Sequence, residues 1–427
     1  MAIVGAGYTG LWTAYYLRRA DPGLRIVIVE REFAGFGASG RNGGWCSALF
    51  PVSHRRLAAV AGREGALAQQ RALDATVTEV GRVVAREGIE AHFARSGQIA
   101  LARTPVQLDR ARAGVERARA FGLGADHIRL LDAAAARGVL GATDVLGATH
   151  SAHCAALHPA RLVRGLAATV ERGGVRLYEA TAASEITAGR VVTDRGTVHA
   201  PYVVRATEGY TADLRGQRRT LAPIYSLMLA TEVLPAAFWD EVGLRRREVF
   251  TDHRHLIIYG QRTADDRIAF GGRGAPYHLG SRTRPAYDRE PAVFAQLHRT
   301  LVELFPALAG VAITHTWGGP LGVPRDWFPS VGLDRVTGLG WGGGYVGDGV
   351  AAANLAGRTL ADLICERDSE LVTLPWVQHR SPRWEPEPLR WVGMTAVQRM
   401  MAGADAAETR TGRSSARAQL VGRLLGA

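Results

Sequence analysis

The sequence predicts an α/β protein in which a Rossmann-like domain is interrupted by a second, β-rich domain of α+β type. Strands alternate with helices at both ends of the chain, the middle is rich in strands, and the chain carries three glycine-rich segments. The length of 427 residues favours two or three domains. With 47% hydrophobic and 22% charged residues, the chain can bury sizeable cores, which excludes a disordered or fibrous protein.

The first thirty residues form a strand–helix–strand unit. Ala2–Val4 is a short apolar strand, Gly5–Gly10 a glycine-rich turn, Leu11–Arg19 a helix and Arg25–Glu30 a buried strand. Strands usually run about five or six residues, so an earlier start of the native chain, upstream of Met1, stays open.

The rest of the chain follows the same alternation around a β-rich middle. The segment Gly35–Gly44 is too irregular for a helix. Helices are expected at 55–87, 105–121, 132–140, 160–171, 290–305 and 350–366, and strands at 97–102, 175–178, 191–193, 197–200, 202–206 and 312–317. Residues 223–272 read as β-rich, and 374–427 as a Pro/Trp-rich tail that ends in a helix.

The turn after the first strand fits the pattern G-x-G-x-x-G through Gly5, Gly7 and Gly10. The first glycine permits the tight turn, the second lets a pyrophosphate approach the backbone, and the third lets helix pack on strand. The helix N-terminus supplies amide N–H groups to the phosphates. Glu30, about twenty residues on, would accept the ribose hydroxyls. The pattern therefore predicts a dinucleotide site rather than an ordinary loop.

Two further glycine-rich segments favour FAD as the dinucleotide. Gly35–Gly44 offers close backbone approach along a pyrophosphate and ribityl chain, with Ser39, Arg41 and Asn42 as polar partners, although taken alone it also fits a flexible surface loop. The segment 342–349 precedes a helix whose N-terminus would stabilise negative charge on a reduced flavin; taken alone it also fits a plain turn.

Charge and composition exclude several classes. The formal net charge is +12, and all 52 basic residues are Arg. They spread along the chain among acids, so we expect no nucleic-acid partner. The absence of Lys excludes a Schiff-base or Walker-A lysine. No apolar run approaches the roughly 18 residues of a membrane span, there is no secretory signal, and three distant cysteines show no metal spacing, so we expect a cytoplasmic protein without metal ligands.

With these motifs in view, the chain resembles the FAD-dependent oxidoreductases of the D-amino-acid oxidase superfamily. Within it, the γ-glutamylputrescine oxidase-like branch, near glycine and sarcosine oxidases, is the most similar. The resemblance covers most of the chain and rests on VGAGYTGLWTAYYL, GFGASGRNGGW, LHPARLV, YVVRATEGYT and GGYVGDGVAAANLAGRTLADLI. The second of these is the most specific to the branch.

The resemblance implies a set of residues that hold FAD without a covalent bond. They are Gly5, Gly7, Gly10, Glu30, Arg31, Ser39, Gly40, Arg41, Asn42, Gly43, Gly44, Ala183, Thr207, Gly209, Gly343, Gly344, Tyr345, Val346, Gly347, Asp348, Gly349 and Val350. Cys46 is expected to be a small packed residue rather than a flavin attachment site.

The resemblance also implies the reaction: hydride transfer from the carbon of a small amine or amino acid to flavin N5, giving an imine that water hydrolyses. Tyr259 and Arg273 would face the flavin, with Tyr259 orienting the substrate and Arg273 gripping a carboxylate. Trp317 would form part of the site wall.

Two departures bear on the electron acceptor. Relatives carry Ser and His where this chain has Val346 and Asp348, and an anion there would oppose reduced flavin unless it caps the helix. Relatives also place a Lys near flavin N5 to help oxygen react, and this chain has none. The sequence therefore leaves two possibilities for the electron acceptor, oxygen or another compound. A flavin dehydrogenase, a tRNA-modifying flavoenzyme and a non-catalytic FAD-binding protein stay as alternatives.

The implied domain division is discontinuous. Residues 1–85, 156–215 and 330–366 would form the FAD-binding domain, residues 86–155 and 216–329 the substrate domain, and residues 367–427 a C-terminal extension.

Overall fold

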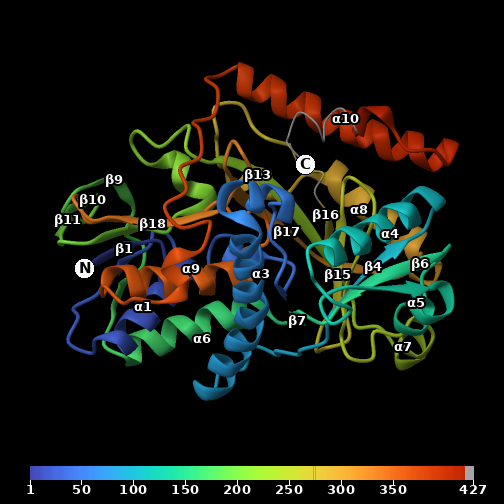
Figure 1. The fold of residues 1–427 in the computed structure, drawn as a ribbon, viewed down its shortest axis with the longest axis horizontal. Coiled ribbons are helices and arrows are strands. Elements are labelled where there is room, and N and C mark those ends of the chain that lie inside the picture. Colours follow the sequence, from blue (N-terminus) through green and yellow to red (C-terminus); the bar gives the residue numbers. More distant parts are fainter. Residues whose placement is uncertain (273, 275, 419–427) are drawn as a thin grey trace.

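The computed structural model describes residues 1–272, 274 and 276–418, and its architecture confirms the predicted α/β class (Figure 1). Within these residues the strands form two large sheets, a three-stranded sheet and a two-stranded ribbon. None of the described helices combines the length and the apolar character that crossing a bilayer requires.

The first large sheet, here called the β1 sheet, carries the predicted strand–helix–strand unit. Its order is β18 (Ser330–Asp334), β19 (Leu339–Gly343), β12 (Val203–Arg205), β1 (Ala2–Val4), β2 (Val27–Val29) and β8 (Arg176–Tyr178). All neighbours pair in parallel except β18 and β19. In the central strand Ala2 pairs with both Val27 and Val203. Parallel pairing places the carboxyl ends of these strands at one edge of the sheet.

Alternation along β1 puts different layers on the two faces of this sheet. Ile3 packs into a core shared with α1 (Tyr8–Ala20), α6 (Pro159–Arg172) and α9 (Gly349–Ile364). Ala2 and Val4 face a small antiparallel sheet of β9 (Ala183–Thr187), β10 (Arg190–Thr193) and β11 (Gly196–His199). Figure 1 shows β1 between these strands and the three helices.

The second large sheet, here called the β13 sheet, is antiparallel apart from its β14–β4 pair. Its order is β17 (Ile313–Val323), β13 (Ala222–Thr231), β16 (Ile268–Gly272), β15 (Ile258–Arg262), β14 (Val249–Asp252), β4 (Gln98–Ala102), β6 (Gly147–Ser151) and β5 (Arg129–Asp132). Phe250 and Phe270 stack in its core, which α7 (Ala236–Val242) and α8 (Pro291–Leu304) cover with side chains such as Phe238 and Leu301.

The remaining elements connect and cover the sheets. They are α2 (Ala38–Arg41), α3 (His54–Arg86), α4 (Pro105–Ala120), α5 (Ala133–Val139), α7 (Ala236–Val242), α8 (Pro291–Leu304), α10 (Leu389–Thr411), β3 (Trp45–Ser47), β7 (Cys154–Ala156) and the short 3-10 helices Glu208–Asp213, Pro285–Asp288, Pro306–Leu308 and Glu370–Thr373. β3 and β7 pair as the two-stranded ribbon.

The prediction that Gly35–Gly44 is too irregular for a helix is wrong, because α2 lies inside it. Asn42 Nδ2 donates to the carbonyls of Ala38 and Ser39 and so satisfies the end of this short helix. Gly40 approaches the Gly35 carbonyl so closely that a Cβ would lie 2.3 Å from its oxygen. The Asn42 hydrogen bonds and the close packing of the glycines, rather than helix propensity, therefore fix α2.

Two other elements differ from the prediction. The strand expected at 312–317 continues to Val323, although Pro320 lies within it. Proline is tolerated because β17 is the edge strand and pairs with β13 alone. The stretch expected to be β-rich carries β13, β14, β15 and β16, and it also contains α7, a helix that was not predicted.

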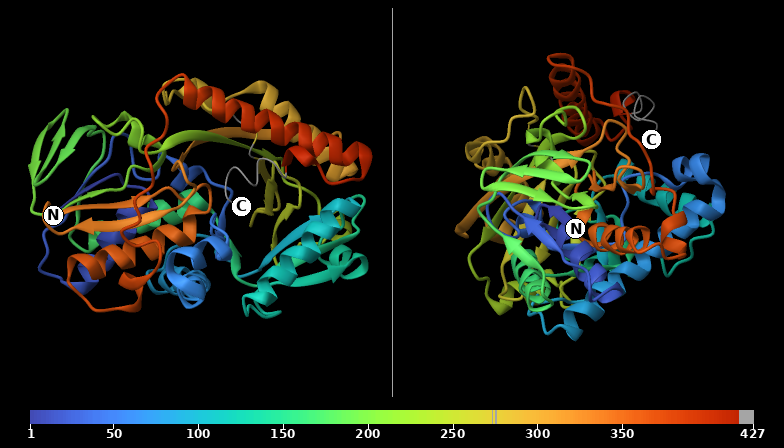
Figure 2. Two further views of the ribbon diagram at one scale, coloured as in Figure 1. Left: turned by 45° about the horizontal axis from the view of Figure 1, so that its top comes forward. Right: turned by 90° about the vertical axis from the view of Figure 1, so that its left-hand side faces the viewer.

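The tail confirms its predicted helix and packs on the β13 sheet. Trp384 is buried, and its indole N–H donates to the carbonyl of Val323 at 2.8 Å. Arg390 is 2% exposed and pairs with Glu387 at 2.8 Å. Figure 2 shows α10 running along this side of the molecule.

The strands of the two large sheets come from alternating stretches of the chain. The β1 sheet draws on strands between residues 2 and 29, 176 and 205, and 330 and 343. Strands of the β13 sheet lie between these stretches in the chain. We therefore propose that residues 1–85, 156–215 and 330–366 form the FAD-binding domain, residues 86–155 and 216–329 the substrate domain, and residues 367–427 a C-terminal extension.

Candidate cofactor and substrate site

The turn between β1 and α1 requires glycine. Gly5 has φ of +105°, and a Cβ there would lie 2.5 Å from the Ala206 carbonyl oxygen. A Cβ on Gly10 would lie 2.0 Å from the Gly5 carbonyl oxygen, so Gly10 lets α1 pack against the turn. Gly7 is the N-cap residue of α1. The positive end of α1 therefore opens onto the edge of the β1 sheet.

Glu30 follows β2 at the same edge. Its two carboxylate oxygens accept hydrogen bonds from the backbone N–H groups of Ala6, at 2.8 Å, and Glu32, at 3.1 Å. Burial raises the pKa of Glu30, and the two backbone donors oppose that rise. Arg31 beside it pairs with Asp213 at 2.9 Å. An anionic acceptor is thus fixed at one end of the turn.

The second glycine-rich segment is bonded to the start of α1. Ser39 Oγ accepts from the backbone N–H of Tyr8 at 2.8 Å. A Cβ on Gly7 would lie 2.8 Å from the same hydroxyl oxygen. Asn42 Oδ1 accepts from Gly44 N–H at 2.8 Å and holds the following turn, in which Gly44 has φ of +72°.

The final glycine-rich segment is held by Glu208, which sequence reasoning missed. The Glu208 carboxylate accepts from the backbone N–H groups of Gly344 and Tyr345, each at 3.1 Å. Burial raises the pKa of Glu208 to about 7, while these two donors and Arg205 act to lower it. The signal in the sequence that could have identified Glu208 is an acidic residue just after the end of a predicted strand, in YVVRATEGYT.

The same segment closes back on α1. Tyr345 Oη lies 2.8 Å from Thr9 Oγ1. Val346 is buried with φ of +56°, a left-handed conformation that is rare for a β-branched residue. Asp348 is the N-cap residue of α9, but its side chain makes no capping hydrogen bond. This carboxylate therefore does not cap α9.

These segments line one cleft. The predicted cofactor residues that line it are Gly5, Gly7, Glu30, Arg31, Ser39, Asn42, Ala183, Thr207, Gly209, Tyr345, Gly347, Gly349 and Val350. Predicted residues outside the lining are Gly10, Gly40, Arg41, Gly43, Gly44, Gly343, Gly344, Val346 and Asp348. Unpredicted lining residues include Tyr8, Phe36, Tyr210 and Pro320.

The cleft fits a dinucleotide. The glycines leave room where side chains would collide with backbone, and the N-termini of α1 and α9 both reach the lining. Glu30 and Ala183 lie toward the β2 end, and Tyr345 and Val350 belong to the final glycine-rich loop and α9.

The β13 sheet packs against the second glycine-rich segment. The Tyr259 ring lies so close to Gly43 that a Cβ there would be 2.9 Å from its Cδ2. Trp317 Nε1 donates to the Arg41 carbonyl at 2.8 Å. The Arg41 guanidinium pairs with Asp288 at 2.6 Å and donates to the Gly318 carbonyl of β17 at 3.0 Å, so its side chain bridges to this sheet.

Two of the three predicted catalytic residues, Tyr259 and Trp317, thus contact the same segment, residues 41–45. Trp45 meets the Tyr259 ring edge-on at 6.3 Å, and Trp317 lies at the other end of the same segment. Arg273 lies outside the described residues.

Cys46 occupies the packed position expected of it. It is fully buried on β3, and burial raises the pKa of its thiol to about 12. All three cysteines are free.

A mostly parallel sheet with a glycine-rich first turn and an acid after the second strand is typical of a dinucleotide-binding protein. The chain matches the family described as "DAO: FAD dependent oxidoreductase" over residues 1–363. It belongs to this family, and FAD is its cofactor.

The chain is similar over most of its length to two bacterial oxidoreductases and to one solved structure. It is 32% identical over 381 residues to the "Probable oxidoreductase OrdL" of Rhizobium meliloti, covering 87% of this chain and 84% of that protein. It is 31% identical to the "Gamma-glutamylputrescine oxidoreductase" of Escherichia coli, covering 88% and 86%. The structure of glycine oxidase from Geobacillus kaustophilus superposes with a TM-score of 0.74 at 20% identity, covering 88% and 98%.

Proposed function

We propose that this protein oxidises the C–N bond of a small amine or amino acid. The observation that carries the proposal is the contact between the β13 sheet and segment 41–45, in which Tyr259 and Trp317 contact the two neighbours of Asn42, a residue that lines the cofactor cleft. The relatives named gamma-glutamylputrescine oxidoreductase and glycine oxidase support the substrate class.

When bound, FAD supplies a hydride acceptor at flavin N5. The chain's own part is to bind the amine, remove water from it and aim its C–H bond. A half-buried aromatic wall of Trp45, Tyr259 and Trp317 favours the neutral amine, because burial disfavours the charged ammonium form. The imine product is then hydrolysed by water.

Tyr259 has a fixed position for orienting the substrate. Its hydroxyl is hydrogen-bonded to Ser226 Oγ on the neighbouring part of the β13 sheet. Trp317 is fixed by its bond to the Arg41 carbonyl. For Arg273 we keep the role proposed from the sequence, a grip on a substrate carboxylate.

A screen of matched substrate pairs tests this function. FAD-loaded protein is mixed without air with amines and amino acids, and separately with the corresponding alcohols and 2-hydroxy acids. We expect the flavin absorption to bleach with at least one nitrogen compound and with none of the oxygen analogues, and ammonia or a shorter amine to appear. Bleaching by the hydroxy compounds alone would overturn the proposal.

The acceptor of the second half-reaction is also proposed. Because the chain contains no Lys, the cation that usually assists oxygen is missing. We propose a dehydrogenase that prefers a quinone-like acceptor. A relative named D-amino acid dehydrogenase, 26% identical over 420 residues, supports this.

A further inference from the structure

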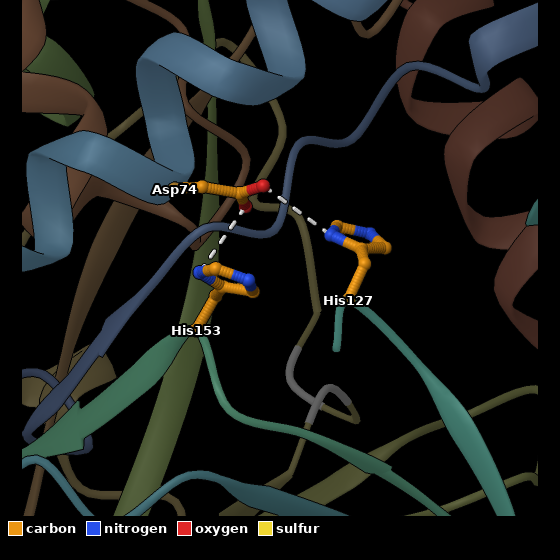
Figure 3. Close-up of side chains that lie close together, drawn as sticks. All are labelled: Asp74, His127 and His153. Carbon is orange, nitrogen blue, oxygen red and sulfur yellow. Dashed lines mark ion pairs between the residues drawn. The ribbon is translucent and has the colours of Figure 1, made fainter. Parts of the chain in front are cut away.

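Three side chains from separate elements meet away from the residues of the cofactor cleft. Asp74 lies on α3, His127 in the turn between α4 and β5, and His153 in the turn between β6 and β7 (Figure 3). His127 Nδ1 lies 3.4 Å from Asp74 Oδ2, and His153 Nδ1 lies 3.8 Å from Asp74 Oδ1. The three donor atoms lie within 4.8 Å of one another.

The two imidazole nitrogens lack hydrogen-bond partners. Nδ1 of His127 and Nδ1 of His153 are both buried and make no hydrogen bond. A buried polar atom left without a hydrogen-bond partner is unfavourable. Both nitrogens face one carboxylate in Figure 3, so a single bound cation between them would satisfy all three groups.

The carboxylate is held in place by an outer hydrogen bond. Gln70 Nε2 donates to Asp74 Oδ1 at 2.9 Å, and Gln70 Oε1 lies 3.1 Å from His54 Nε2. Gln70 is itself buried, with 6% of its surface exposed. Outer partners of this kind orient the ligands of metal sites.

The spacing suits a small transition-metal ion. Bonds of about 2.0–2.1 Å in a tetrahedral site separate the donor atoms by about 3.4 Å. The two Asp74–imidazole separations are 3.4 and 3.8 Å. His127 and His153 also line a wide cavity, from which water can supply a further ligand.

A second cluster, formed by His255, Asp405 and Glu408, differs because its polar atoms already have hydrogen-bond partners. His255 Nε2 lies 2.9 Å from Glu408 Oε1, and Arg110 donates to the other Glu408 oxygen at 2.8 Å. Both Asp405 oxygens accept from the backbone N–H groups of His255 and Leu256 at 2.8 Å. Because these donors are already engaged with a guanidinium and the backbone, this trio fastens α10 and leaves no place for a cation.

We propose that Asp74, His127 and His153 bind one divalent transition-metal ion of the Zn²⁺ class, with water completing its coordination. The two imidazoles and one carboxylate suit borderline metals over Mg²⁺ or Ca²⁺. Such an ion would join α3 to two turns of the neighbouring part of the chain and so raise the thermal midpoint of unfolding.

Metal binding is measured on tag-free, FAD-loaded protein. After chelator treatment, Zn²⁺ is added, unbound ion is removed by gel filtration, and metal is counted by mass spectrometry. We expect one Zn²⁺ per chain and an upward shift of the thermal midpoint. X-ray absorption at the zinc edge should show two imidazoles with oxygen ligands. Less than a tenth of an equivalent bound at micromolar Zn²⁺, or thiolate ligands, would overturn the proposal.

Substitutions locate the ion. Asp74→Asn keeps the side-chain shape and removes the charge, and His153→Gln removes one imidazole; each should weaken Zn²⁺ binding at least a hundredfold. His92→Gln is the matched control, because His92 and His158 form another ring pair, with centroids 6.0 Å apart against 5.6 Å for His127 and His153. Equal flavin content and elution volume show intact folding. If His153→Gln does not fold, the Zn²⁺ affinity of Asp74→Asn is the deciding measurement. Unchanged affinity in Asp74→Asn contradicts the site.

Discussion

Glu30 is the residue on which the orientation of FAD in the cleft depends. It is fixed by backbone donors at 2.8 and 3.1 Å and lines the cleft. We expect Glu30→Ala to lose FAD on dialysis at least tenfold faster, because hydrogen bonds to a charged acceptor are each worth about 1.5–3 kcal/mol. Glu32→Ala, a neighbouring exposed carboxylate, is the control and should keep its flavin. Full occupancy in Glu30→Ala would mean that the adenosine end lies elsewhere.

Glu208 gives the flavin-free protein a pH dependence of stability. Its pKa is raised to about 7 in the folded state, above its ordinary value of 4.5, so the folded protein binds the proton more tightly than the unfolded chain. Stability should therefore fall as pH rises from about 4.5 to 7, by about 3 kcal/mol, and then level off. Denaturant unfolding at pH 5, 6, 7 and 8 measures it.

Glu208→Gln supplies the comparison for that experiment. The amide cannot ionise, so the variant should lose this share of the slope. Its amide oxygen keeps one acceptor for the Gly344 or Tyr345 N–H. Parallel curves for the two proteins between pH 5 and 8 would show that Glu208 does not titrate in this window.

At the scale of elements, the glycine-rich segments show what local pattern predicts and what it leaves out. The β1–α1 turn is predictable because it needs a positive φ at Gly5 and no Cβ at Gly10. Only glycine meets these two requirements readily, so the glycine pattern in the sequence reveals the turn. The helix α2 is not predictable, because it depends on Asn42 reaching back to two carbonyls. Glu208 was missed for a different reason, since its partners lie about 136 residues away in the chain.

The ribbon of β3 and β7 bears on how the cofactor is attached. Cys46 and Cys154 are fully buried in this ribbon as protonated thiols, since burial raises the pKa of both. A thiol without thiolate character is a poor nucleophile. We expect acid precipitation to release all of the yellow chromophore into the supernatant. A yellow pellet that turns colourless in Cys46→Ala would establish covalent attachment instead.

Across the whole molecule, the sequence predicted the fold class better than the meeting of distant parts. Periodicity found most helices and four strands of the β1 sheet (β1, β2, β8 and β12), because each depends on its own apolar face, but it missed β18 and β19 of the same sheet. It did not find β5, β6 or β7, whose pairing is decided by partners far along the chain. The contacts of Tyr259 and Trp317 with segment 41–45 are likewise set by sheet packing.

The missing lysine has a consequence for turnover as a whole. Oxygen reacts with reduced flavin through a developing negative charge that a nearby cation stabilises. Arg41, in the segment against which the flavin is expected to lie, is engaged with Asp288, so this cation already has an acidic partner. We expect stopped-flow reoxidation by air to be slower than by a quinone or dye. Reoxidation by oxygen that outpaces every dye tried would identify an oxidase.

The central claim is that one FAD spans the cleft from Glu30 to the segment beneath the β13 sheet. A crystal structure of the FAD-loaded protein tests it most directly. The adenosine ribose should lie within hydrogen-bond distance of Glu30, the pyrophosphate at the N-terminus of α1, and the flavin ring against segment 41–45, facing Tyr259 and Trp317. A flavin ring on the far side of that segment, away from both aromatic side chains, would contradict the account.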